Sequence, residues 1–146
     1  MKVRPALVLI QNNCVLTMRY RYGQTDVYNL PGGNPDTGET MPQTIIRELF
    51  EEMGIEVTVA ELLACGEVIL PQQAKDVLHC VFLGEIKSGI PILNSQETSA
   101  EAIVWQPIGQ LDTLNMYPNI GKDLKNILQQ QTSGVYLGKI DQAWYA

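Results

Sequence analysis

Hydrophobic and polar positions alternate along the chain in short runs, and these runs predict several strands. Two apolar runs, 5–10 and 14–18, flank the polar residues 11–13, a pattern that indicates a β-hairpin. The polar and aromatic stretch 20–24 is predicted to be a loop. Apolar or alternating runs predict further strands at residues 27–30, 55–59, 62–70, 77–86, 102–106 and 135–140.

Two segments, residues 40–53 and 120–131, are predicted to be helices. On a helical wheel of the first segment, with about 100° per residue, the apolar side chains gather on the side expected to face the core. These side chains are Ile46, Leu49, Phe50 and Met53. Gly54 provides a left-handed stop after the last turn. Strands and helices interleave irregularly, which favours an α+β fold whose mixed sheet carries helices on both faces.

The same helix carries an acidic stripe. With Glu48 at zero on the wheel, Glu52 falls ~40° to one side and Glu51 ~60° to the other. Arg47 lies beside this stripe, four residues before Glu51 and within its reach. Like charges at these spacings destabilise an isolated helix by ~0.2–0.5 kcal/mol per pair. The stripe is therefore either a solvated helix face or a site for a hard cation such as magnesium, which takes oxygen ligands.

The segment before the helix bears on this choice. Residues 30–33 (Leu-Pro-Gly-Gly) bring a strand into a tight glycine turn, where backbone can approach a ligand or a metal closely. Residues 34–38 follow as a compact loop with strong turn chemistry. Glu39 then stands at the helix entrance, where the helix dipole favours a carboxylate. A plain turn into a capped helix would show a similar pattern, so this loop alone does not decide the function.

Loop and helix together resemble the Nudix box, G-x5-E-x7-R-E-U-x-E-E-x-G-U, in which U is a bulky apolar residue. The matching positions are Gly33, Glu39, Arg47, Glu48, Leu49, Glu51, Glu52, Gly54 and Ile55, with no mismatch. The upstream hairpin and the strand exit 105–108 also look like the family. The chain is identified as a member of the Nudix (MutT-like) hydrolases. This implies an α/β/α sandwich with a mixed central sheet, and we expect one such domain over residues 1–146.

The resemblance implies metal-dependent hydrolysis of a diphosphate bond, by attack of water on phosphorus, in a nucleoside diphosphate linked to another group. Mg²⁺ is the expected cofactor, with Mn²⁺ as an alternative. Glu48 and Glu52 would be the main metal ligands, and Glu51 would be either a ligand or the acceptor of the proton from water. The carbonyl of Gly32 would reach a metal.

Other residues are assigned supporting roles by the same resemblance. Arg47 would orient the carboxylates, and Glu39 would support the loop, so both are counted with Glu48 and Glu51 as catalytic. The family often takes a further acid from a distant loop as ligand or base. Glu97, in the polar stretch 94–99, is favoured for this role over Glu101, which almost belongs to the next strand. Either residue is otherwise a surface acid.

The sequence identifies the residues that determine substrate specificity less clearly than it identifies the acidic residues of the box. Arginines suit phosphate recognition and tyrosines suit stacking on a base. The candidates cluster just before the box and are Arg19, Tyr20, Arg21, Tyr22 and Tyr28. The alternative is that these side chains merely cover the edge of the sheet. Family members that cleave ADP-ribose, dinucleoside polyphosphates, nucleotide sugars or nucleoside triphosphates share the box and differ in these loops.

The net charge and the apolar runs of the chain limit the kinds of molecule that it is expected to bind. The net charge of −6 argues against a nucleic-acid binder, which needs a basic footprint, but it allows a small nucleotide held through a cation. The longest apolar runs are too short to cross a bilayer, and we expect a cytoplasmic protein. We also expect a monomer or a homodimer. Cys14, Cys65 and Cys80 lack metal-site spacing and are expected to be buried free thiols. His79, the only histidine, lies in a core-like strand.

Two other functions fit parts of the pattern. A Nudix-fold module that senses or binds a nucleotide without catalysis would more often have lost carboxylates of the box. An isomerase of isoprenoid diphosphates would need additional Cys and Glu motifs, which the sequence does not show. Hydrolysis is therefore the favoured activity.

Overall fold

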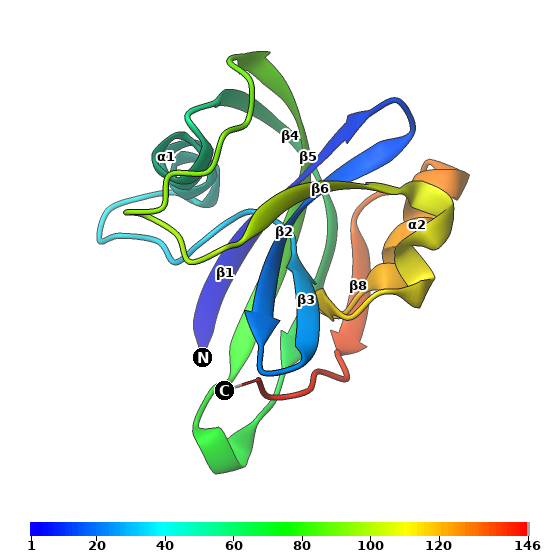
Figure 1. Ribbon diagram of the computed structural model, residues 1–146. Helices are drawn as coiled ribbons and strands as arrows, with labels where there is room; N and C mark the ends of the chain where they lie inside the picture. Colours follow the sequence, from blue (N-terminus) through cyan, green and yellow to red (C-terminus); the bar gives the residue numbers. More distant parts are fainter. Residues whose placement is uncertain (146) are drawn as a thin grey trace.

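The computed structural model describes residues 1–145, so Ala146, the last residue of the expected domain, lies outside the described residues. The strands are β1 (Lys2–Gln11), β2 (Cys14–Tyr22), β3 (Thr25–Asn29), β4 (Glu56–Val68), β5 (Val77–Ser88), β6 (Ala102–Pro107), β7 (Met116–Tyr117) and β8 (Val135–Lys139). The helices are α1 (Met41–Met53) and α2 (Gly121–Gln130), with short 3₁₀ turns η1 (Pro71–Gln73) and η2 (Ile108–Thr113). Figure 1 shows α1 and α2 on opposite sides of the strands, which confirms the expected α/β/α arrangement.

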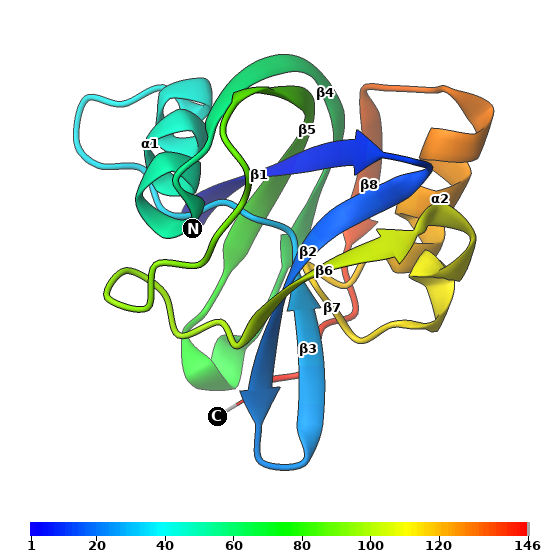
Figure 2. The ribbon, with the colours of Figure 1, turned by 45° about the horizontal axis from the view of Figure 1, so that its top comes forward.

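The strands form one mixed sheet in the order β7-β3-β2-β1-β5-β4-β8, and β6 pairs with β2 outside this path. β1 and β5 run parallel in the middle of the sheet, while β4 is antiparallel to β5. The first two strands form the predicted hairpin, whose turn residues Asn12 and Asn13 adopt positive φ angles of 50° and 60°. Figure 2 shows the β2–β3 hairpin extending away from α1, toward the C-terminal end of the chain.

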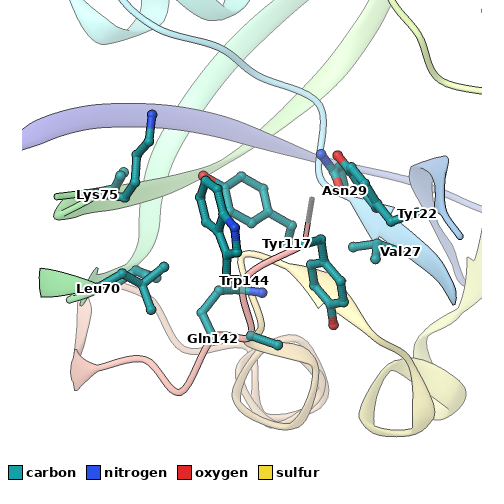
Figure 3. A pocket seen from close by; sticks show the side chains of 12 residues that line it. Tyr22, Val27, Asn29, Leu70, Lys75, Tyr117, Gln142 and Trp144 are labelled. Atoms are coloured by element: carbon teal, nitrogen blue, oxygen red, sulfur yellow. The ribbon is translucent and has the colours of Figure 1, made fainter. Parts of the chain in front are cut away.

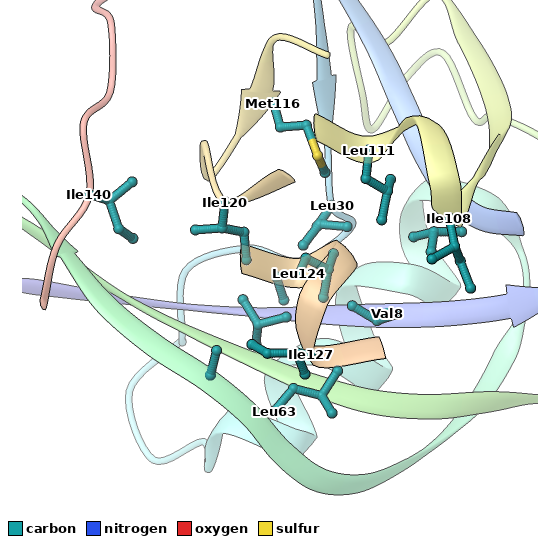
Figure 4. Close-up of a cluster of buried hydrophobic side chains, with 14 of the residues drawn as sticks. Val8, Leu30, Leu63, Ile108, Leu111, Met116, Ile120, Leu124, Ile127 and Ile140 are labelled. Carbon is teal, nitrogen blue, oxygen red and sulfur yellow. The ribbon is translucent and has the colours of Figure 1, made fainter. Parts of the chain in front are cut away.

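Strand β1 is buried on both faces because each face is covered by a helix. Successive side chains of a strand point to opposite faces, so Val8 packs under α2 whereas Leu7 and Leu9 pack under α1. Figure 4 shows Val8 in the α2 core beside Leu124 and Ile127. Burial of each of these large side chains stabilises the fold by about 1.5–3 kcal/mol. The strand that leads to the functional loop is thereby fixed in place.

Helix α1 begins at a capping box that the sequence analysis did not identify, and it ends at the expected glycine. The side chain of Thr40 accepts from the backbone N–H of Gln43, and the Gln43 side chain accepts from the Thr40 N–H, which forms a capping box. Gly54 ends the helix with φ 67°. The buried side chains are those of Thr44, Ile45, Leu49 and Met53.

One expectation for α1 is wrong, because Ile46 and Phe50 are 43% and 58% exposed rather than core-facing. The sheet covers only the stripe that repeats every four residues, Ile45, Leu49 and Met53. Residues on either flank of that stripe stay outside the core, the carboxylates on one side and these two apolar side chains on the other. The sequence pattern showed the apolar half of the helix but not how much of it the sheet covers.

Two boundary predictions also need correction. Residues 20–24 are not a loop, because β2 continues to Tyr22 and only the turn at Gly23 and Gln24 separates it from β3. Backbone pairing of Tyr20 with Val27 provides the hydrogen bonds that make this polar stretch a strand. Residues 55–59 and 62–70 form one strand, β4, in which irregular register at residues 59–64 absorbs the polar interruption.

The remaining predictions concern cysteines, the histidine and membranes. All three cysteines are free thiols, but only Cys80 is buried as expected, whereas Cys14 and Cys65 are half-buried. His79 is 1% exposed, in agreement with its core-like position in the sequence. Neither helix found within residues 1–145 has the length and apolar character needed to cross a membrane.

Candidate active site

The glycine turn before α1 lies directly against the acidic stripe. A Cβ at Gly33 would collide with the Cδ of Glu48, and a Cβ at Gly32 would collide with the carbonyl oxygen of Pro5. The N–H of Gly33 also donates to the Pro5 carbonyl over 3.2 Å. Only glycine allows the backbone to approach both β1 and the Glu48 carboxylate this closely. The turn therefore places peptide groups beside a carboxylate of the box.

Arg47 connects the loop to the helix. Its Nε donates to Oε2 of Glu39 over 2.6 Å, and its Nη2 donates to Oε1 of the same carboxylate over 2.9 Å. Glu39 also accepts from the N–H of Asp36 and from the hydroxyl of Thr44. The hydrogen bonds from Arg47 are the main reason why the pKa of Glu39 is lowered to about 2. Glu39 is thus an anionic anchor for the loop.

The same guanidinium reaches the acidic stripe. Nη1 of Arg47 donates to Oε1 of Glu48 over 3.1 Å and to Oε2 of Glu51 over 3.3 Å. One arginine therefore holds carboxylates from the loop and from the helix in a fixed relation, as its planar five-donor geometry allows. The expected reach from Arg47 to Glu51 is confirmed.

Two of the stripe carboxylates are poorly accommodated without a cation. Burial, together with the negative charge of Glu48, raises the pKa of Glu52 to about 7. Burial also raises the pKa of Glu48, while the hydrogen bond from Arg47 opposes that change. A half-buried pair of like charges is an arrangement that a bound cation would relieve.

The residues present fit a magnesium site of the water-rich kind. Within residues 1–145, no group of three or more His, Cys, Asp or Glu side chains is arranged so that it could bind a metal ion by itself. Mg²⁺ usually binds through one or two carboxylates and completes its octahedral shell with waters and substrate phosphates. Oxygen donors on a half-exposed helix face meet that requirement, and they are hard ligands of the type that Mg²⁺ and Mn²⁺ prefer.

The loop that carries Glu97 is held against the C-terminal end of α1. The N–H of Asn94 donates to the carbonyl of Glu52 over 2.8 Å, and its side-chain amide donates to the carbonyl of Glu51 over 3.3 Å. The charge of Glu97 is one of those that raise the pKa of Glu52, after burial and Glu48. Glu101 instead starts the approach to β6, where its N–H donates to the carbonyl of Arg19. The geometry thus brings the Glu97 loop, rather than Glu101, to the acidic helix.

Arg4 is a charged residue near this site that the sequence pattern did not single out. Its Nη2 donates to the carbonyl of Leu30 over 3.0 Å, and its guanidinium lies 4.9 Å from the ring centre of Tyr117. Its Nη1 is buried and has no hydrogen-bond partner within residues 1–145. Burial lowers the pKa of Arg4, and the carboxylates of Glu52 and Glu48 act in the opposite direction. The one feature of the sequence that could have pointed to Arg4 is its position as a lone arginine near the start of an apolar strand.

A cavity of about 350 Å³ lies on the other side of Tyr117. It is lined by Tyr22, Val27, Asn29, Val68, Leu70, Lys75, Val77, Tyr117, Gln142, Ala143, Trp144 and Tyr145. Figure 3 shows Lys75 and Leu70 on one side of Trp144, with Asn29, Val27 and Tyr22 on the other. The Oδ1 of Asn29 is buried and accepts no hydrogen bond from any described residue. The cavity therefore combines aromatic walls with a lining residue whose buried acceptor has no partner among the described residues.

Of the five candidate substrate residues, only Tyr22 lines this cavity. The hydroxyl of Tyr20 shares a hydrogen bond of 2.8 Å with that of Thr98, and Arg21 forms an exposed 3.1 Å ion pair with Asp26 near the hairpin turn. Arg19 and Tyr28 face each other as backbone partners in β2 and β3. Their roles stay predictions.

The aromatic residues of the cavity come instead from distant parts of the chain. Tyr22 ends β2, Tyr117 belongs to β7, and Trp144 lies after β8. No local spacing connects these three residues, so only the folded topology could bring them together. Tyr22 alone belongs to the aromatic stretch that the sequence marks before the box.

Comparison with known proteins agrees with this geometry. A Bacillus subtilis (strain 168) protein, named as a candidate 8-oxo-dGTP diphosphatase, is 27% identical over 119 residues, which cover 82% of this chain and 75% of that protein. The structure of a NUDIX hydrolase from Nitrosomonas europaea matches with a TM-score of 0.74 at 18% identity, over 90% of each chain. An ADP-ribose pyrophosphatase from Streptococcus suis 89-1591 matches with a TM-score of 0.66 at 18% identity, over 96% of this chain and 98% of that one.

The family match covers the whole region that holds the loop, the acidic helix and most of the sheet. The model of the NUDIX domain family matches residues 2–131. This span includes both the glycine turn and the carboxylates that Arg47 orders. The chain therefore belongs to the NUDIX domain family and is a Nudix pyrophosphohydrolase.

Proposed function

We propose that this chain hydrolyses, with the help of Mg²⁺ or Mn²⁺, a diphosphate bond in a nucleoside diphosphate linked to another group. The observation that carries the proposal is the carboxylate pair Glu48 and Glu52, half-buried on one helix face, with a pKa of about 7 at Glu52. Such an arrangement is unfavourable for a plain helix surface and favourable for a cation site. The substrate is a small nucleotide rather than a nucleic acid, in line with the net charge of −6.

The metal would be held by Glu48 and Glu52, with Glu51, the carbonyl of Gly32 and Glu97 as further oxygen donors. Support comes from the Gly33 turn, which packs against Glu48, and from the Asn94 hydrogen bonds, which hold the Glu97 loop to α1. The chemistry that such an ion supplies is charge neutralisation of the diphosphate and activation of the attacking water.

The protein's own groups orient the reaction. Arg47 fixes the directions of Glu48 and Glu51, while Glu39 holds Arg47 through two hydrogen bonds. The side chain of Glu51 is 39% exposed and that of Glu48 only 19%, so Glu51 is the better placed to meet a water from solvent and to accept its proton. Water then attacks phosphorus directly, without a covalent intermediate on the protein.

The nucleoside end of the substrate would occupy the aromatic cavity. Tyr117 lines this cavity and also contacts Arg4, and the carboxylates Glu48 and Glu52 act on the pKa of Arg4. Arg4 thus lies between the cavity and the acidic stripe, where its free Nη1 would donate to a phosphate oxygen. The Oδ1 of Asn29 would accept an N–H of the base. These roles place the diphosphate between the base and the carboxylates.

The proposal is tested by a hydrolysis panel with product identification in oxygen-18 water. The panel contains four nucleoside triphosphates, 8-oxo-dGTP, ADP-ribose, a dinucleoside polyphosphate and a nucleotide sugar, each with and without MgCl₂. We expect turnover of at least one class only with the divalent cation, and label in a phosphate of one product. Label on a sugar carbon, or turnover unaffected by a chelator, would contradict the mechanism. Tight nucleotide binding without turnover of any compound would instead indicate the sensing module.

A further inference from the structure

We propose that residues 142–145 form a specificity-determining wall of the nucleoside subsite, and that Trp144 stacks on the base. The inference rests on the proposed function, since it assigns a part of the same cavity. Of the twelve residues that line the cavity, four are Gln142, Ala143, Trp144 and Tyr145. The match to the NUDIX domain family covers residues 2–131, so this wall lies after the matched residues.

The segment is anchored to the fold by Gln142, which is 8% exposed. Its Nε2 donates to the carbonyl of Met116 over 3.1 Å, and its Oε1 accepts from the N–H of Asn119 over 2.8 Å. The side-chain amide of Asn119 in turn donates to the carbonyl of Asp141 over 2.8 Å. These three hydrogen bonds fix the chain just before Trp144 and direct it over the cavity.

Aromatic contacts continue the segment across the cavity. The ring centre of Tyr145 lies 5.7 Å from that of Tyr22 in a stacked arrangement, with 23° between the planes. The Nζ of Lys75 lies 6.0 Å from the ring centre of Trp144. The segment thereby touches the end of β2 on one side and the turn after η1 on the other, and Figure 3 shows Trp144 between these two groups. An indole held in this way presents a preformed flat surface to the cavity.

A flat aromatic wall selects ligands by their bases rather than by their phosphates. Nucleobases stack on tryptophan through their π faces, whereas phosphates need cations or hydrogen-bond donors. The acidic stripe would therefore act on the phosphates, and the wall would select ligands that carry a base over ligands that do not. Because Trp144 is 49% exposed, its removal would widen the cavity without opening the hydrophobic core.

The test compares Trp144→Ala and Trp144→Phe with the unaltered chain, and with Tyr136→Ala as a control. Tyr136 is an exposed aromatic residue of β8 outside the cavity lining. Isothermal titration calorimetry measures binding of dAMP, dGMP, dCMP and dTMP, with 2-deoxyribose 5-phosphate as a probe that lacks a base. We expect Trp144→Ala to weaken the best-bound monophosphate about ten-fold or more, and Trp144→Phe to weaken it less than about three-fold. Tyr136→Ala should bind as the unaltered chain does.

The base-free probe separates stacking from a general loss of structure. Its binding should be the same in Trp144→Ala as in the unaltered chain, and the thermal midpoints should agree. Equal binding of the best monophosphate by Trp144→Ala and the unaltered chain would overturn the inference, and so would failure of the unaltered chain to bind any of the four. Both outcomes leave open whether the chain hydrolyses diphosphates, which the Glu52→Gln variant decides separately by turnover.

Discussion

The Nε of Arg47 lies 2.6 Å from Oε2 of Glu39, and this contact joins the loop before α1 to the acidic face of the helix. It is shorter than the other ion pairs formed within residues 1–145. Because the same guanidinium also reaches Glu48 and Glu51, a change at Arg47 alters the direction of every carboxylate it holds. Arg47 is thus a positioning residue whose effect should be visible without any change in the metal ligands.

We predict that Arg47→Lys lowers kcat about ten-fold or more, while circular dichroism still shows a folded chain. A lysine offers one point charge and cannot hold three carboxylates with a planar fork. Losses of about 10–100-fold are typical when the partner of a metal ligand is removed. Lys125→Gln is the control, because it removes an ion pair with Asp112 at an equally exposed position away from the site. Equal kcat values for the two variants would contradict the positioning role.

The distal acid is tested by changing Glu97 and Glu101 separately to Gln. We predict the larger loss of activity, about ten-fold or more, at Glu97, because the Asn94 hydrogen bonds hold its loop to the end of α1. Glu101 lies just before β6, where its backbone is tied to Arg19, and its change should cost little. The measurement is kcat/KM at several magnesium concentrations. Small and equal losses at both positions would mean that neither acid belongs to the site.

His79 should make the protein less stable in mild acid. Burial lowers the pKa of His79 to about 3, well below the unfolded value of about 6.5. The unfolded chain therefore binds more protons between these values, so the free energy of unfolding falls as the pH drops below about 6.5. We expect this side chain to contribute a loss of about 1–2 kcal/mol between pH 7 and pH 5.

The matched variant for this effect is His79→Phe. It keeps an aromatic ring against Tyr117, whose ring centre lies 5.0 Å away, and it removes two nitrogens that find no hydrogen-bond partner among the described residues. Urea unfolding at pH 7 and pH 5 should show a smaller difference in the variant than in the unaltered chain. The carboxylates titrate in both proteins and cancel in this comparison. Identical pH dependence in the two proteins would show that folding does not lower the pKa of His79, and would contradict the prediction.

The features that local sequence determines were predictable. The helix α1 was visible because its apolar positions at helical spacing and its stop at Gly54 all lie within 15 residues. The reach from Arg47 to Glu51 follows from helical geometry alone. The carboxylates that Arg47 holds, Glu39, Glu48 and Glu51, all lie within this one segment or next to it, so their proximity could be expected from the sequence alone.

The features that depend on long-range packing were not predictable in the same way. Ile46 and Phe50 are exposed because the sheet covers only one stripe of α1. The helical period of the sequence does not predict how wide the covered stripe is. The strand at Tyr20–Tyr22 forms because β3 supplies backbone partners, although its side chains suggest a loop. The cavity is assembled from Tyr22, Tyr117 and Trp144, which are separated along the chain by tens of residues or more. Tertiary contacts decide each of these features.

The most direct test of the central claim is the magnesium-dependent turnover of Glu52→Gln, measured with the best substrate of the hydrolysis panel. This change removes a carboxylate oxygen ligand and keeps the side-chain volume, so the fold should persist in far-UV circular dichroism. Glu61→Gln, at an exposed position of β4, controls for the loss of one negative charge. We predict that Glu52→Gln lowers turnover more than about 100-fold at saturating magnesium, whereas Glu61→Gln stays within about two-fold. Turnover of Glu52→Gln within a few-fold of the unaltered chain would contradict the metal site and the mechanism built on it.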